Sequence, residues 1–387
     1  MYLASRFLTR DYTANPPPPT KSSSHQKAGY LPELWLGLIH NRIPRGLSVV
    51  ELVCRARDFH ASDPRDKVFG LLGLANDISL DTDLRNLRPD YMRSKTEVYS
   101  GFAQDIIRKT GTLDILSAVN TFTDESGPDN SISWMPDLDI SIATIRGLGF
   151  PSKYNASFST KALISTPNHP AILSLSGFIL DVVSPTISPL LTLRTDLQLY
   201  IGASPNAIPT LWTDYLQPHY DPNAEASLQA FIHTLTAAGF ALRTQFPAHP
   251  LGKIVPPHSI PSLAADLAAY IHKTQSLPNS PFPNTEALQK LAADGDADQF
   301  AVLVGKACHE RKFFITGEGR MGLCPRGVKE GDRVVVLYGG SVPYALRKVE
   351  GDRWCFVGEC YVDGWMFGEA EGVRGQGVKE ERVFDLV

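Results

Sequence analysis

The sequence has few cysteines, and their spacing suggests neither a disulfide framework nor a metal site. Only five cysteines occur among 387 residues, and no two of them form a C-x-x-C pair. An odd number of thiols without that spacing argues against a disulfide scaffold and against a zinc ribbon. We therefore expect free, buried thiols in a reducing compartment, which favours a cytoplasmic protein.

Long apolar runs and an excess of charge are also missing. The first residues, MYLASRFLTRDY, interrupt a short apolar run with Arg6 and Arg10, which fits neither a secretory signal nor a membrane span. Lys and Arg together number 37 against 41 Asp and Glu, so the formal net charge is -4. A chain so near neutrality gives no general electrostatic reason to expect a nucleic acid or an anionic membrane as its partner.

The motifs of common enzyme classes are absent as well. The sequence contains no P-loop, no HExxH helix, no GxSxG elbow and no aromatic and basic RNA-binding string. The string from Gly317 to Gly322 fits GxGxxG, but turn and strand residues follow it instead of a helix that could bind a pyrophosphate. Cys308 and His309 are adjacent, and adjacent helical residues point about 100° apart, so they cannot readily form a dyad. We expect no cofactor, no metal and no catalytic residue.

Proline is in surplus, with 29 residues against a usual share of about 5%, so many loops are expected. Periodicity predicts an α+β protein: a helical N-terminal unit, then a small antiparallel β-barrel or roll interrupted by a helical insertion. The predicted parts are a flexible Pro- and Ser-rich tail (1–30), a helical unit (31–118), a loop-rich connection (119–165), a β unit (166–189 and 311–370), a helical insertion (190–310) and a charged tail (371–387).

Two helices of the N-terminal unit have recognisable starts. In residues 62–74, Asp63 is expected to cap a helix, with Pro64 at its first position and Asp66 near the positive end of the dipole. The second helix begins with Ser94-Lys95-Thr96-Glu97, which is a capping box, and ends in a basic turn. This second helix is the most strongly specified element of the sequence.

The β unit is predicted from short apolar runs between glycine-rich turns. The run from Ile172 to Val183 is typical of one strand bent at Gly177 or of two short strands. Five or six short strands follow at regular spacing between 312 and 370, and we expect the run at 172–183 to join their sheet. In the polar stretch before this run, Trp134 is expected to act as a hydrophobic anchor for its loop.

The densest charge cluster is Asp63-Pro64-Arg65-Asp66-Lys67. Alternating charges of this kind can form a site for an anionic ligand or for the charges of a partner protein. The alternative, which the sequence favours, is a capped helix start in which Arg65 and Lys67 make local ion pairs.

Carboxylates close in sequence are the other candidates for chemistry. Glu359, Asp363 and Glu369 lie in the β unit, and paired carboxylates can act as general acid and base. Glycines beside Glu359 and Asp363 indicate strand ends, where solvated carboxylates are common, and no His or Lys lies nearby in sequence to complement them. A catalytic role for these carboxylates is therefore the less favoured interpretation.

Three strings of this sequence match, in order and spacing, strings known from one protein family. They are ASDPRDKVFGLLGLA at 61–75, SWMPD at 133–137, and a C-terminal run from 311 to 364. The first resembles "TDPRDKVYALLGLA" and the second "SWVPDW" of the fungal heterokaryon incompatibility proteins. The candidate positions for interaction or for structure are Asp63, Pro64, Arg65, Asp66, Lys67, Trp134, Pro136, Gly322, Gly331, Asp332, Arg347, Gly358, Glu359, Tyr361 and Gly364.

The resemblance implies a role in fungal non-self recognition, in which members trigger vegetative incompatibility and programmed cell death after unlike cells fuse. The family's amino-terminal domain carries a "YxALSYxWG" string, and residues 1–30 contain nothing similar. That domain is regarded as the death effector and has been compared with Toll/interleukin-receptor domains, some of which cleave NAD. The sequence therefore looks like the accessory portion, as a truncated paralogue or an incomplete gene model.

Two functional hypotheses follow from these features. The first is an incompatibility protein fragment without enzymatic activity that works through contacts with other proteins. The alternative is an enzyme of a hydrolase or NAD-cleaving type that uses Glu359, Asp363 or Arg65 in a cleft between the β unit and the helical units.

Overall fold

The computed structural model describes most of the chain beyond residue 46, in two compact units. The described residues are 47–57, 61–75, 77, 88–119, 132–139, 147–149, 154–164, 171–193, 199–202, 204, 207–220, 225–238, 260–274, 293–370, 372 and 380–387. The first unit holds the described residues up to Asp105 and those at 137–139, and the second holds the rest. The predicted tail at 1–30 lies outside the described residues. Both helices and strands are present, which confirms the mixed class.

Helices build the first unit. They are α3 (Val49–Arg55), α4 (Asp66–Phe69), the 3-10 turn η1 (Leu72–Leu74) and α5 (Lys95–Thr110), whose last turn belongs to the second unit. The predicted capping box at the start of α5 is confirmed: the Ser94 hydroxyl accepts from the Glu97 amide at 3.2 Å, and the Glu97 carboxylate accepts from the Ser94 amide at 2.8 Å. Two otherwise unpaired amides are thereby satisfied at the start of the helix.

The helix predicted over 62–74 is shorter and begins later than expected. It consists of α4 and η1, and Arg65, not Asp63, occupies the position before the first helical residue without a side-chain cap. The Asp63 carboxylate is bound to Arg65, accepting from its backbone amide at 3.0 Å and from its side chain. An aspartate that bonds two residues ahead forms a turn, so it does not cap the helix.

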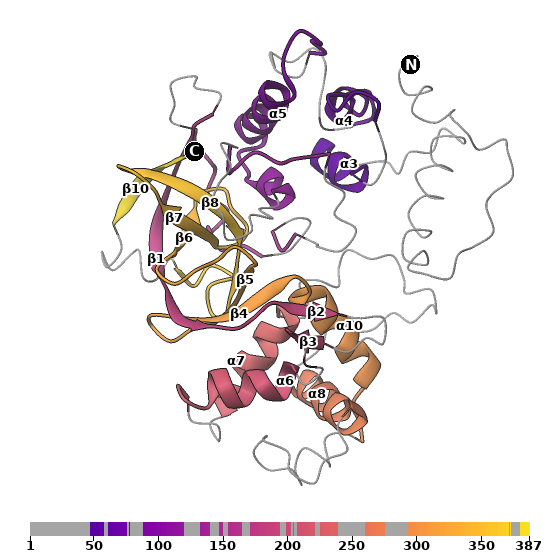
Figure 1. Cartoon of the computed structure of the whole chain (residues 1–387), viewed down its shortest axis with the longest axis vertical. Coiled ribbons are helices and arrows are strands. Elements are labelled where there is room, and N and C mark those ends of the chain that lie inside the picture. The colour runs from indigo at the N-terminus through magenta and orange to yellow at the C-terminus, as the bar shows by residue number, and fades with distance from the viewer. Residues whose placement is uncertain are drawn as a thin grey trace, which may run out of the picture. The chain divides into compact units, whose positions relative to one another are not determined.

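Among the described residues of the second unit, ten strands form a sheet (Figure 1). They are β1 (Leu173–Ile187), β2 (Leu191–Leu193), β3 (Leu199–Ile201), β4 (Arg311–Thr316), β5 (Met321–Pro325), β6 (Arg333–Leu337), β7 (Tyr344–Lys348), β8 (Arg353–Glu359), β9 (Tyr361–Val362) and β10 (Glu381–Leu386). Strand β10 pairs with both β1 and β8, so the pairings through β1, β6, β7, β8 and β10 return to β1. The remaining strands extend from the second half of β1 through β4.

The long strand β1 joins the C-terminal sheet, as predicted. It pairs with β6 and β10 on one side of the topology and with β4 on the other. Its middle, residues 177–182, pairs with β6, and its end pairs with β4, with an irregularity of the β6 register between Ile179 and Asp181. At Gly177 a Cβ atom would lie 2.1 Å from the Val336 carbonyl oxygen of β6. Glycine is therefore required there because the neighbouring backbone approaches too closely for a side chain.

Helices occupy the chain between β3 and β4. They are α6 (Ala207–Thr210), the π-helical turn η4 (Leu211–Leu216), α7 (Glu225–Thr236), α8 (Ile260–Thr274) and α10 (Ala297–Cys308). Figure 1 shows α7, α8 and α10 packed together beside β2 and β4. Leu263, Leu267 and Ile271, which share one face of α8 by helical spacing, are buried. The helical pattern predicted from residue 190 begins later, because β2 and β3 precede α6 and extend the sheet.

The residues predicted to form a charged C-terminal tail contain strand β10. Phe384 and Leu386 alternate with polar residues and are buried, while β10 pairs with β1 in an antiparallel register. The tail interpretation was wrong for 381–386: side chains two residues apart point to the same face of a strand, and on β10 that face buries Phe384 and Leu386. Phe384 packs edge-on against Trp354 of β8, with 5.3 Å between the ring centroids.

Candidate functional site

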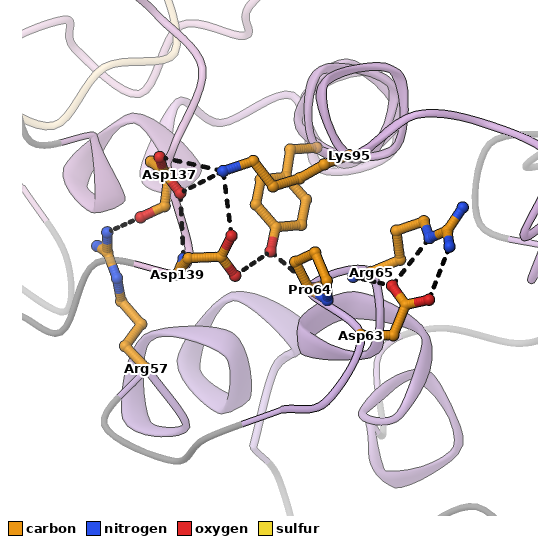
Figure 2. Close-up of polar contacts among 8 residues, drawn as sticks. Arg57, Asp63, Pro64, Arg65, Lys95, Asp137 and Asp139 are labelled. Carbon is orange, nitrogen blue, oxygen red and sulfur yellow. Dashed lines mark hydrogen bonds and ion pairs between the residues drawn. The ribbon is translucent and has the colours of Figure 1, made fainter.

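Arg65 organises the charged string of the first unit (Figure 2). The Asp63 carboxylate accepts from the Arg65 Nε at 2.9 Å through Oδ1 and from Nη2 at 2.7 Å through Oδ2. This paired geometry matches the planar fork of a guanidinium, which a lysine could not reproduce. The hydrogen bond from Arg65 lowers the pKa of Asp63 below its ordinary value.

The same guanidinium holds the loop that precedes α5. Its Nη1 donates to the backbone carbonyls of Tyr91 at 2.6 Å and Arg93 at 2.8 Å, and its Cζ lies 5.3 Å from the centre of the Tyr91 ring. The Tyr91 hydroxyl donates to Asp66, and this bond is the main reason that the pKa of Tyr91 rises to about 12. Between these fixed residues, Met92 is 94% exposed.

Lys67, the last residue of the string, is buried in the first unit. Its side chain is 6% exposed, and its Nζ donates to the carbonyl of Arg57 at 2.8 Å, just beyond the end of α3. A positive charge near the C-terminal end of a helix is favourable because the last carbonyls carry a partial negative charge. Lys67 therefore joins α3 to α4.

Two aspartates that follow the SWMP string complete this network (Figure 2). The Lys95 ammonium lies 3.4 Å from the Asp137 carboxylate and 3.1 Å from that of Asp139. The Tyr99 hydroxyl lies 2.9 Å from Asp139 and 2.7 Å from the Pro64 carbonyl, which ties the helix α5 to the charged string. Burial, followed by the bond to Asp139, raises the pKa of Tyr99.

Trp134 and Pro136 belong to the second unit and are buried. The indole Nε1 of Trp134 donates to the Ala171 carbonyl at 3.3 Å, just before β1, as expected for an anchor of its loop. The neighbouring Ser133 accepts from the Phe356 amide of β8 at 2.9 Å and bonds to the Val387 carbonyl. Ser133 thus connects the SWMPD string with β8 and with the C-terminal residue Val387.

Glu359 is the last residue of β8, as its flanking glycine suggested, but its carboxylate is buried and not solvated. It is 9% exposed, and its two oxygens accept from consecutive amides, Leu148 N at 2.6 Å and Gly149 N at 3.0 Å. Ser341 supports the same segment by donating to the Gly149 carbonyl at 2.6 Å. Glu359 therefore holds residues 147–149 against the strands, which covers the carboxylate.

Asp332 and Arg347 form a bidentate pair between β6 and β7. Arg347 donates through Nε to Oδ1 at 2.8 Å and through Nη2 to Oδ2 at 2.7 Å, and it also donates to the Gly327 carbonyl at 2.7 Å. Asp332 is 3% exposed and also accepts from the Lys329 amide. Gly331 lies in the turn that leads to this aspartate.

The other candidate glycines lie on strands or at their ends. At Gly322 a Cβ atom would lie 2.5 Å from a ring carbon of Phe314 and 2.5 Å from the Tyr361 carbonyl oxygen, so a side chain would separate β5 from its neighbours. Gly358 lies in β8 and Gly364 follows β9. Tyr361 is buried, and its hydroxyl lies 3.3 Å from the Asp363 carboxylate.

Asp363 has a histidine partner that its sequence neighbourhood does not contain. His233 of α7 places its Nδ1 3.3 Å from Asp363 Oδ1, although 130 positions separate the two residues. Helix α7 packs against β5, which brings the two together. The pairing depends on this long-range packing, so no local signal could have indicated it.

The adjacent Cys308 and His309 do not form a dyad, as expected. The Cys308 thiol donates to the Leu235 carbonyl, and burial raises its pKa to about 12. The His309 Nδ1 accepts from the Leu193 amide at 3.0 Å. The Gly317–Gly322 string forms the hairpin between β4 and β5.

The described part of the chain offers neither a cluster of metal ligands nor a membrane-spanning helix. Within it, no group of three or more His, Cys, Asp or Glu residues is arranged to hold a metal ion. None of the helices found there is long and apolar enough to cross a membrane.

Comparisons with known proteins connect this architecture with one family. The profile of the Het-6 beta-barrel domain matches residues 284–377, the range that holds α10 and strands β4 to β9. The chain is 25% identical over 363 residues to the heterokaryon incompatibility protein 6, OR allele, of Neurospora crassa. That match covers 83% of the chain and 51% of the relative, so the chain spans about half the length of this curated relative. No solved structure matches the chain.

Proposed function

We propose that this chain, which is related to the heterokaryon incompatibility family, acts in non-self recognition and cell death signalling through contacts with other proteins in the cytoplasm. The Het-6 barrel match and the similarity to the Neurospora protein support the general role. The contacts with other proteins are inferred from the charged string at 63–67, which fixes the loop that carries Met92.

The observation that carries the proposal is the loop fixed by Arg65. Three groups of the string act on this loop: Arg65 binds the Tyr91 and Arg93 carbonyls, Asp63 holds Arg65, and Asp66 binds the Tyr91 hydroxyl. A single exposed apolar residue is ordinary on a protein surface. Met92, however, is 94% exposed on a backbone held by several bonds, and a preorganised apolar group loses little entropy when it binds a partner.

The use of Glu359 weighs against the enzymatic alternative. Both of its oxygens accept from backbone amides. A carboxylate held in this way is not available to take a proton from a substrate, because a general base must reach the proton that it abstracts. We therefore infer that Glu359 has a structural role and does not carry out hydrolase or NAD-cleaving chemistry.

A separation-of-function experiment tests the proposal. The full chain is expressed in a fungal host in which incompatibility is scored as the fraction of fused cells that take up a vital dye. Met92→Lys should reduce that fraction while leaving the melting temperature unchanged, because Met92 contacts little of its own chain. Leu163→Lys is the matched control, since Leu163 is 72% exposed in the second unit, and it should leave the response intact.

Two results would contradict the proposal. One is a wild-type response that Met92→Lys leaves unchanged. The other is turnover of NAD by the purified chain that Glu359→Gln abolishes without lowering the melting temperature, which would establish the enzymatic alternative.

A further inference from the structure

A cluster of polar side chains in the second unit surrounds the His233–Asp363 contact described above. It contains His233 of α7, Arg320 just before β5, Asp363 just after β9, and Tyr220 in the turn after η4. Four separate segments thus contribute to one place. Fixed polar groups from several segments are typical of a binding site.

The imidazole of His233 is oriented by Asp363. The contact through Nδ1 leaves the other ring nitrogen, Nε2, outside the pair. Asp363 Oδ1 also lies 3.3 Å from the Tyr361 hydroxyl. The negative charge of Asp363 is therefore shared by two groups of the protein, while the His233 side chain remains 27% exposed.

Arg320 is held in place with donors to spare. Its Nη1 donates to the Asp363 carbonyl at 3.2 Å, and its Cζ lies 4.6 Å from the centre of the Trp365 ring. Gly364 makes room for this position, because a Cβ there would lie 2.4 Å from the Arg320 Nη1. A guanidinium has five N–H donors, and among the described residues the Arg320 side chain makes this one hydrogen bond, so several donors are left for a ligand.

Tyr220 contributes a buried hydroxyl that has no hydrogen-bond partner among the described residues. The hydroxyl lies against the turn that carries Arg320, since a Cβ at Gly319 would be 3.9 Å from it. Burial raises the pKa of Tyr220, and Arg320 and Asp363 are the charges that act on it. A buried hydroxyl normally finds a partner, and a ligand bound at this cluster would supply one.

We propose that Arg320, Tyr220 and His233 bind the phosphoryl group of a small molecule. The unused groups of Arg320 and Tyr220 are donors, which suits an anion. Arginine pairs well with phosphate oxygens because its donors lie in one plane. Because the Asp363 carboxylate accepts from Nδ1, the Nε2 of His233 is a donor only in the imidazolium form. In that form, three donors on different segments fit a group with three terminal oxygens better than a carboxylate, which has two.

The test is titration calorimetry of the full chain with inorganic phosphate. We expect saturable binding at one site that Arg320→Gln weakens at least about tenfold, because it removes charge-assisted hydrogen bonds. Arg353→Gln is the matched control: Arg353 is exposed, loses the same charge, and should change the affinity less than about twofold. Acetate should bind at least about tenfold more weakly than phosphate.

Tyr220→Phe provides a second measurement that does not depend on a loss of folding. Without phosphate the variant should be as stable as wild type or more so, because the lost hydroxyl had no partner. Saturating phosphate should then raise the melting temperature of wild type more than that of Tyr220→Phe. The proposal is overturned if phosphate does not bind, if the two arginine variants weaken binding equally, if acetate binds as tightly as phosphate, or if phosphate raises the melting temperatures of wild type and Tyr220→Phe equally.

Discussion

Replacing Glu359 with glutamine tests whether this buried carboxylate serves the fold. The substitution keeps the size and shape of the side chain but removes its charge and turns one acceptor oxygen into an amide donor. In the folded chain the two oxygens accept from the Leu148 and Gly149 amides at 2.6 and 3.0 Å. A glutamine can accept only one of these bonds, and its amide group then faces the other N–H.

The expected cost follows from these contacts. A buried amide left without an acceptor costs about 1–3 kcal/mol. Arg311 adds to this cost: it is 4% exposed, burial lowers its pKa, and Glu359 is the first charge that opposes this effect. Loss of this compensating charge brings the total to about 3 kcal/mol, which corresponds to roughly 5 °C in melting temperature for a unit of this size.

Differential scanning calorimetry of the full chain measures this change. Glu350→Gln is the control, since Glu350 is exposed and a surface substitution changes stability by no more than about 0.5 kcal/mol. If Glu359→Gln melts within about 1 °C of this control, the amide contacts do not stabilise the fold. The structural role assigned to Glu359 would then be refuted.

Three other substitutions have definite expected outcomes. Gly177→Ala should cost at least about 3 kcal/mol in urea unfolding, because the new Cβ would lie 2.1 Å from the Val336 carbonyl oxygen; wild-type stability would contradict the close pairing of β1 and β6. Tyr99→Phe should cost about 1–2 kcal/mol, since its hydroxyl bonds both Pro64 and Asp139, and an unchanged midpoint would exclude that bridge. Burial raises the pKa of Asp114 above its ordinary 3.8, so the charged form is disfavoured by folding, and the stability gained from the protonated form is lost as pH rises through the raised pKa. Asp114→Asn should therefore gain stability relative to wild type between pH 4 and pH 7, and a constant difference would contradict this sign.

Local signals in the sequence were sufficient for some elements. The start of α5 was predictable because Ser94 and Glu97 are three residues apart and satisfy each other's amides within one turn. Burial of Leu263 and Leu267 in α8 follows from helical spacing alone. The start of α4 was not predictable in this way, because the choice of Asp63 between a cap and Arg65 depends on the loop that Arg65 also binds.

Long-range pairing explains what the sequence could not show. Glu359 meets Leu148 across 211 positions, and this contact turns an expected solvated carboxylate into a buried one. His233 and Asp363 meet only because α7 packs on β5. For Phe384 and Leu386 the alternating pattern was present, but a charged surrounding sequence concealed it.

The most direct test of the proposed function is the response of fused fungal cells to Met92→Lys, measured together with Leu163→Lys at matched protein levels. Recognition through the loop held by Arg65 predicts that the Met92 variant lowers the fraction of dying fused cells and that the Leu163 variant does not. Equal responses from wild type and both variants would contradict it.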